Sequence, residues 1–156
     1  MNLAAIQQAL RDEKLDGWLF FDHHIRDPLA YRVLDFQAPR IPTRRWYYLI
    51  PAHGEPRKLV HQIEPGMLDD LPGTKNTYSS WSRQVYGLTT LLDGCKRVAM
   101  QYSPDCAIPY LSRVDAGTAE AVRRHGVEIV GSGDLVQLFE ASWSEAQLGT
   151  HRAASD

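Results

Sequence analysis

The densest group of residues able to do chemistry is the polar segment 22–28, where Asp22, the adjacent His23 and His24, Arg26 and Asp27 interrupt an apolar stretch. Imidazole and carboxylate groups are ligands for divalent metals. Adjacent side chains on an extended segment point to opposite sides, however, so two neighbouring histidines chelate one metal ion poorly. The stronger metal pattern, two histidines at i and i+4 on a helix, is absent. We therefore expect neither a metal site nor a catalytic residue here.

The same segment follows Trp18–Phe21, an apolar run that predicts a strand buried on both faces near the centre of a sheet. Ligands of α/β proteins bind beyond the carboxyl ends of such strands. Arg26 offers a bidentate donor for carboxylates. The alternative is a surface loop whose charges are simply solvated.

A second candidate, Gly131-Ser132-Gly133, lies between a predicted strand and a predicted helix, where a phosphate-binding loop would stand. The dinucleotide pattern needs a third glycine at position 136, which is Val136, so helix capping is the better interpretation. No GxSxG or P-loop motif occurs, and the carboxylates are scattered. The sequence therefore predicts no complete catalytic site.

The elements that position these residues alternate between helices and strands. Apolar spacing and turn residues predict helices at 3–14, 29–34, 81–92, 116–124 and 134–140, and strands at 18–21, 46–50, 57–63, 74–78, 98–102 and 127–130. The second and third strands read as an antiparallel hairpin. Trp81, Val85, Leu88 and Leu92 are the expected core face of their helix. The fold class is α/β, a mixed β-sheet flanked by helices on both faces.

Composition narrows the function classes. A net charge of -2 provides no basic field for nucleic acid or anionic lipid, and no apolar run approaches the roughly 20 residues that cross a bilayer. The two cysteines, Cys95 and Cys106, are too few and too far apart for a CxxC motif. We expect a reduced, cytoplasmic protein with no nucleic-acid or membrane partner.

The tail differs from the rest of the chain. Ser144 to Gln147 fit a capping box, yet only Leu148 among the residues that follow is strongly apolar. A helix with so little to bury usually continues into a segment that packs against it. We therefore expect residues 1–141 to form one domain and residues 142–156 to begin a linker helix to a further domain.

Taken as a whole, the sequence resembles the N-terminal domain of the creatinase, prolidase and aminopeptidase P family of metallopeptidases. The resemblance spans most of the chain, and residues 98–118 are its most specific part. The segments that carry it are GWLFFD (17–22), RRWYYLIPAHGEPRKLVHQIEP (44–65), YSSW (78–81), VAMQYSPDCAIPYLSRVDAGT (98–118) and VEIVGSGDLVQLFEASWSEAQL (127–148).

The resemblance implies a ribonuclease H-like sheet and a non-catalytic domain that shapes substrate access and takes part in homodimer contacts. It places the Xaa-Pro peptidase chemistry, with two divalent ions (Mn, Co or Zn), on a separate C-terminal catalytic domain, so this chain should hold no cofactor. In relatives the loop after the first strand carries an aromatic residue, a basic residue and glycine after the aspartate, where this chain has His23, His24 and Ile25. The resemblance implies a substrate or interface role for Asp22, His24 and Arg26.

Two other classes remain open. One is an independent small-ligand or oligomerisation module. The other is a nuclease using a ribonuclease H-like sheet, which needs carboxylates clustered on adjacent strands, and only Asp22 is suitably placed.

Overall fold

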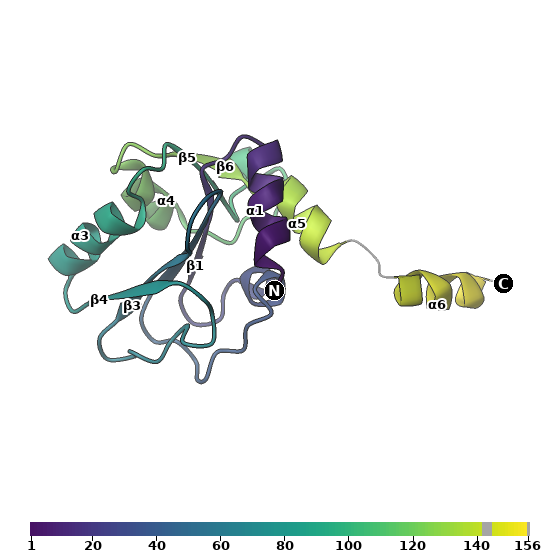
Figure 1. Ribbon diagram of the computed structural model, residues 1–156, viewed down its shortest axis with the longest axis horizontal. Coiled ribbons are helices and arrows are strands. Elements are labelled where there is room, and N and C mark those ends of the chain that lie inside the picture. Colours follow the sequence, from purple (N-terminus) through teal and green to yellow (C-terminus); the bar gives the residue numbers. More distant parts are fainter. Residues whose placement is uncertain (142–144, 156) are drawn as a thin grey trace.

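In the computed structural model, which describes residues 1–141 and 145–155, a six-stranded sheet has the strand order β4-β3-β2-β1-β5-β6 (Figure 1). The elements in chain order are α1 (Leu3–Asp12), β1 (Gly17–Asp22), α2 (Pro28–Val33), β2 (Trp46–Pro51), β3 (Arg57–His61), β4 (Thr74–Tyr78), α3 (Trp81–Leu91), β5 (Arg97–Met100), the short helix η1 (Pro104–Cys106), α4 (Ala116–Arg123), β6 (Glu128–Gly131), α5 (Gly133–Glu140) and α6 (Glu145–Ser155). Each predicted strand is present, with ends that differ by a few residues.

The sheet is mixed, as predicted. β1 pairs antiparallel with β2 in a register that runs from Gly17 opposite Pro51 to Asp22 opposite Trp46. β2 pairs antiparallel with β3, which confirms the hairpin, whereas β1 with β5, β5 with β6 and β3 with β4 are parallel. The carboxyl ends of β1, β5 and β6 therefore lie at the same edge of the sheet, and the loop after Asp22 begins there.

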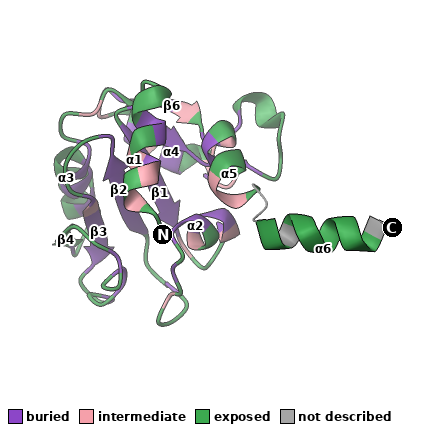
Figure 2. Cartoon of the chain, turned by 45° about the vertical axis from the view of Figure 1, so that its right-hand side comes forward, coloured by how far each residue is buried: buried purple, intermediate pink, exposed green. Residues whose placement is uncertain are grey.

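Helices cover both faces of the sheet, which also confirms the sequence prediction. α1, α2 and α5 bury Leu10, Leu29 and Leu135 against one face, where they meet Trp18 and Trp46. α3 and α4 pack on the opposite face. All six residues of β1 are buried, because this strand lies between both layers (Figure 2). An apolar run without alternation is what such a position requires.

Side-chain caps begin four of the helices. Asn2, Asp27, Ser80 and Asp115 each accept a backbone N–H from the first turn that follows them. Such a cap satisfies an N–H group that has no partner within the helix, which stabilises the helix by about 1 kcal/mol.

One turn depends on glycine for geometric reasons. Gly73, just before β4, has a φ of 108°, and a Cβ built there would lie 2.2 Å from the Pro56 carbonyl oxygen. The same carbonyl accepts the N–H of Thr74 at 3.0 Å, which begins the pairing of β4 with β3. A side chain at position 73 would therefore collide with the backbone that sets this strand pair.

The C-terminal helix α6 extends away from the layered part of the molecule in Figure 1, and its described side chains are exposed. The predicted capping box includes Ser144, which lies outside the described residues. Among the described helices, none combines the length and the apolar character that a membrane crossing needs.

Candidate functional site

The carboxylate of Asp22 organises the loop that follows β1. It is buried, and its two oxygens accept the backbone N–H groups of Ile25 at 2.9 Å, Arg26 at 2.7 Å and Asp27 at 3.0 Å, together with the hydroxyl of Tyr31 at 2.6 Å. Burial, followed by this hydrogen bond to Asp22, raises the pKa of Tyr31, so the tyrosine stays a donor. Asp22 thus holds the loop from inside and does not face solvent.

Two consecutive residues of the loop adopt left-handed backbone conformations. His24 has a φ of 64° and Ile25 a φ of 55°, a region that a β-branched side chain rarely enters. The N–H of His24 donates to the Pro42 carbonyl at 2.9 Å, and the Asp22 oxygens hold the next three N–H groups. Ile25 thus takes a backbone conformation that suits glycine better than a β-branched residue.

The exposed side chains of the loop are those of His24, Ile25 and Arg26. Of the three candidates implied by the sequence, His24 and Arg26 thus share the outer surface of the loop, and Asp22 supports them from beneath. Partial burial and then the charge of His24 lower the pKa of His23. The His23 ring contacts the Thr43 carbonyl at 3.2 Å, so its direction is set by the chain on the other side of the loop.

Asp27 closes the loop and begins α2. One of its oxygens accepts the N–H groups of Leu29 at 3.1 Å and Ala30 at 3.2 Å, while the other oxygen is buried and has no hydrogen-bond partner among the described residues. Burial raises the pKa of Asp27 to about 6, and the nearby charge of Asp22 acts in the same direction.

The donor groups of this loop do not fit a divalent metal. Both oxygens of Asp22 are occupied by N–H and O–H donors, the rings of His23 and His24 meet edge to face at 4.3 Å, and Asp27 serves as a helix cap. Nowhere in residues 1–141 and 145–155 do three or more His, Cys, Asp or Glu side chains converge as a metal site. Among the polar side chains of the loop, His24 and Arg26 are the ones left exposed at its surface.

A hollow of about 350 Å³ lies beside the loop, and the lining includes arginine and histidine side chains but no carboxylate of the described residues. His23, Arg44, Arg45 and His61 contribute to it, with Tyr78 at its side. Glu64 is near this basic group, but its carboxylate accepts the Thr43 hydroxyl and the backbone N–H groups of Thr43 and Arg44. The hollow therefore continues the cationic surface of the loop along the start of β2.

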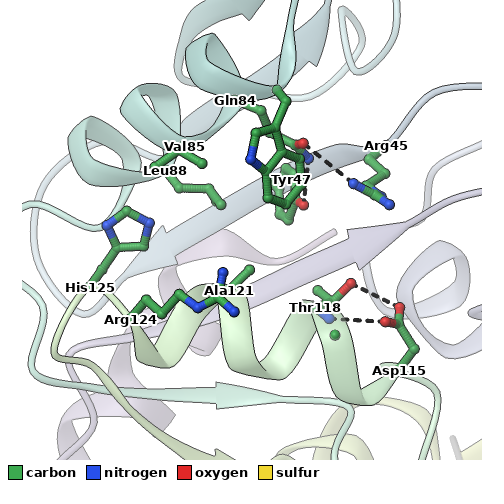
Figure 3. Close-up of a pocket in the computed structure, with 12 residues that line it drawn as sticks. Arg45, Tyr47, Gln84, Val85, Leu88, Asp115, Thr118, Ala121, Arg124 and His125 are labelled. Carbon is green, nitrogen blue, oxygen red and sulfur yellow. Dashed lines mark hydrogen bonds between the residues drawn. The ribbon is translucent and has the colours of Figure 1, made fainter.

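A second cavity, of about 310 Å³, lies between α3 and α4 above β2 (Figure 3). Arg45, Trp81 and Gln84 line both this cavity and the basic hollow. Its floor is Tyr47, whose hydroxyl accepts a 2.8 Å hydrogen bond from the Gln84 amide. Asp115 also lines it, and its carboxylate accepts the N–H and hydroxyl of Thr118 at 2.9 and 2.8 Å.

Sequence reasoning missed this cavity because it placed Trp81 and Val85 of α3 in the core, although the prediction that Leu88 and Leu92 are buried is confirmed. Trp81 and Val85 are 61% and 40% exposed, whereas Gln84, Gly87, Leu88 and Leu91 are buried. A Cβ at Gly87 would lie 2.6 Å from a methyl group of Leu59, so this face of the helix rests directly on β3. The signal available in the sequence was the glycine itself, which permits such a close approach.

The segment Gly131-Ser132-Gly133 joins β6 to α5, as the sequence predicted. Ser132 stands at the cap position of α5, but its hydroxyl makes no capping hydrogen bond, is buried and has no partner among the described residues. A Cβ at Gly131 would lie 2.8 Å from the Tyr102 carbonyl oxygen, so the close approach of β6 to the chain after β5 requires glycine. Ser132 therefore occupies the cap position that the capping interpretation expects, but its hydroxyl does not make the capping hydrogen bond.

Comparison with known proteins gives a consistent answer at the level of the fold. No protein-family model and no curated protein matches the sequence. Several solved structures, however, have a fold similar to that of this chain. A proline dipeptidase from Streptococcus pneumoniae TIGR4 is similar with a TM-score of 0.67 and 17% identity, over 91% of this chain and 98% of that one. The creatinase/prolidase N-terminal domain of an X-Pro dipeptidase from Streptococcus pyogenes is similar with a TM-score of 0.63 and 11% identity, over 86% of this chain and 95% of that one.

This chain has the creatinase/prolidase N-terminal domain fold. The likeness extends to the prolidase from Pyrococcus horikoshii OT3, with a TM-score of 0.61 and 15% identity over 94% of this chain. The chain covers only 37% of the length of that prolidase. The creatinase/prolidase N-terminal fold thus occurs both within a much longer chain and in structures of about this length.

Proposed function

We propose that this chain is the non-catalytic N-terminal domain of a Xaa-Pro dipeptidase-like metallohydrolase, in which it shapes substrate access and contributes to dimer contacts. The observation that carries the proposal is the fold, which matches creatinase/prolidase N-terminal domains over nearly the whole chain. The distribution of metal-binding side chains also supports the proposal, because no group of three or more His, Cys, Asp or Glu residues in the described part of the chain could hold a metal ion. Two divalent ions would be held by a C-terminal catalytic domain, with residues 1–141 as this domain and 142–156 as the start of the linker.

In this proposal the loop after β1 is the contact surface. His24 and Arg26 are exposed on a backbone that Asp22 holds rigid, and the basic hollow with Arg44 and Arg45 lies beside them. A peptide substrate carries a terminal carboxylate, which arginine binds through two parallel hydrogen bonds. The loop would therefore attract and orient the carboxylate end of a short peptide at the entrance.

The first test is activity of this chain alone. Purified protein with added Mn²⁺ or Co²⁺ is expected to leave Xaa-Pro dipeptides intact, and metal-dependent turnover that co-purifies with the chain would overturn the proposal. The coding sequence beyond the codon for Asp156 is the second test. It should encode a domain with Asp, His and Glu metal ligands, and a stop codon there would exclude a covalently linked catalytic domain.

The third test uses the parent chain with its catalytic domain. The substitution Arg26→Gln should raise the KM for Xaa-Pro dipeptides roughly tenfold while leaving kcat nearly unchanged, because a charged hydrogen bond to the substrate carboxylate is lost. Arg40→Gln is the matched control, since Arg40 is exposed and its only hydrogen bond among the described residues is to the Ile63 carbonyl. Equal kinetic effects of the two substitutions would exclude a specific role for Arg26.

A further inference from the structure

We propose that the cavity between α3 and α4 is a binding site for a small monocarboxylate with a planar apolar body, such as an aryl carboxylate. The cavity does not include the exposed residues of the loop after β1, although Arg45 lines both the cavity and the basic hollow beside that loop. The inference depends on four features of the cavity: its size, its apolar walls, the hydrogen-bond donors of Tyr47 and Arg45, and the balance of its charges.

The size fits such a molecule. The cavity has a volume of about 310 Å³. A cavity of roughly 150 Å³ is enough for benzene, and small-molecule sites begin at about 300 Å³. The space therefore accommodates one aromatic ring and a short acid-bearing chain, but not a large cofactor.

The walls are apolar and come from both helices. Trp81 and Val85 on α3 are 61% and 40% exposed, and both line the cavity. Gly117 and Ala121 of α4 line it as well, and Figure 3 shows Ala121 on the helix opposite Val85. Trp81 makes no ring-ring contact among the described residues. A large aromatic side chain gains by covering its surface, and offset or edge-to-face contact with a second ring adds about 0.5–1.5 kcal/mol. A planar ligand would supply that surface.

Among the described residues, the floor and mouth of the cavity carry one donor without an acceptor, the Tyr47 hydroxyl, and one cation without a carboxylate partner, Arg45. Tyr47 is 2% exposed and Gln84 is 4% exposed, and the Gln84 amide donates to the Tyr47 hydroxyl at 2.8 Å. The hydroxyl proton of Tyr47 has no acceptor among the described residues, and burial raises the pKa of Tyr47, so that proton remains available. At the mouth, the Arg45 guanidinium donates to the Gln84 side-chain oxygen at 3.4 Å. No carboxylate pairs with Arg45 in the described part of the chain.

The charges lining the cavity suit a single negative charge. Arg45 and Arg124 are cationic, and burial lowers the pKa of His125, which keeps that ring neutral near pH 7. Asp115 is the one carboxylate in the lining, and its oxygens already accept the N–H and hydroxyl of Thr118. The balance of one uncompensated positive charge favours a monoanion over a neutral molecule or a dianion.

Phenylacetate is the probe for the test, with phenylacetamide as its neutral isostere and inorganic phosphate as an anion without an apolar body. Titration by calorimetry is expected to show saturable binding of phenylacetate, at least tenfold weaker binding of phenylacetamide and no saturable binding of phosphate. In ¹H-¹⁵N spectra the indole N–H of Trp81 should shift with phenylacetate. The proposal would be overturned if phenylacetate and phenylacetamide bound with equal affinity. It would also be overturned if phosphate bound saturably at the same site with an affinity equal to that of phenylacetate.

Separate substitutions test the contributions of Arg45, Tyr47 and the apolar wall formed by Trp81. Arg45→Gln should weaken phenylacetate about tenfold or more, and Tyr47→Phe about fivefold. Trp81→Ala should weaken acid and amide alike, because it removes only the apolar wall. Arg45 and Trp81 are exposed, so these two changes leave the core intact. Arg83→Gln is the matched control, because Arg83 is an exposed charge on α3 that does not line the cavity. This substitution should leave the affinity for phenylacetate unchanged. If Arg83→Gln reduced the affinity as much as Arg45→Gln, the effect would be a general one of surface charge, and the proposed site would be refuted.

Discussion

Replacing Asp27 by asparagine should change how stability depends on pH. Asp27 is 2% exposed, and burial raises its pKa from 3.8 to about 6. Because the folded state then holds a proton that the unfolded chain releases, stability falls as pH rises from about 4 to about 6. At roughly 1.4 kcal/mol per pH unit, this difference corresponds to about 3 kcal/mol lost by pH 7. Asparagine does not ionise in this range, so the variant should lack this loss.

The substitution is conservative for the helix cap. Asparagine is as good an N-cap residue as aspartate, and its side-chain oxygen can still accept the N–H groups of Leu29 and Ala30. The partnerless oxygen of Asp27 becomes an NH₂ group, which adds an offset that does not depend on pH. The informative quantity is therefore the change with pH in the difference between variant and wild type, since the contributions of other titrating groups cancel.

The assay is denaturant unfolding of both proteins at intervals from pH 4 to pH 7.5. The free energy of unfolding of Asp27→Asn relative to wild type should increase by about 2.5 kcal/mol across this interval, with most of the change between pH 4 and pH 6. A difference that stays constant with pH would refute the reasoning, because it would mean that Asp27 ionises in the folded protein as easily as in the unfolded chain.

Three further predictions concern the loop after β1 and the turn before β4. Ile25→Gly should stabilise the protein by about 0.5–1 kcal/mol, because it relieves the left-handed strain at φ 55°, whereas Ile25→Ala should give no such gain; thermal unfolding measures both. Gly73→Ala should cost about 3 kcal/mol or more, since its Cβ would meet the Pro56 carbonyl at 2.2 Å; the control Gly54→Ala, with open space around it, should cost only about 1 kcal/mol in the same denaturant titration. Asp22→Ala should lower the free energy of unfolding by about 3 kcal/mol or more, because three N–H groups and one hydroxyl lose their acceptor, and a loss below 1 kcal/mol would contradict that role.

The sheet could be predicted because its signal is local. Trp18–Phe21 is apolar without alternation, and only a strand covered on both faces needs that pattern. The hairpin is marked by Gly54 between two strand-like runs, and Asp115 marks the start of α4. These features depend on neighbouring residues in the chain, which the sequence contains.

The site could be predicted only in part, because its geometry depends on residues far apart in the chain. The burial of Gln84 requires the hydroxyl of Tyr47, and periodicity assigns a glutamine to the surface. The sequence does not distinguish an aspartate that binds a ligand from one that holds its own loop. The role of Asp22 is therefore visible only in its hydrogen bonds. The left-handed conformation of Ile25 opposes its propensity and has no sequence signal.

The carboxylate beneath the loop has a consequence for how such a surface can diversify. Asp22 belongs to a buried strand and grips main-chain N–H groups, which every residue except proline possesses. The outward-facing side chains at positions 24 and 26 can therefore be exchanged without redirecting the backbone that presents them. One anchored aspartate thus separates the shape of the loop from its chemical specificity, so that new recognition properties require no redesign of the scaffold.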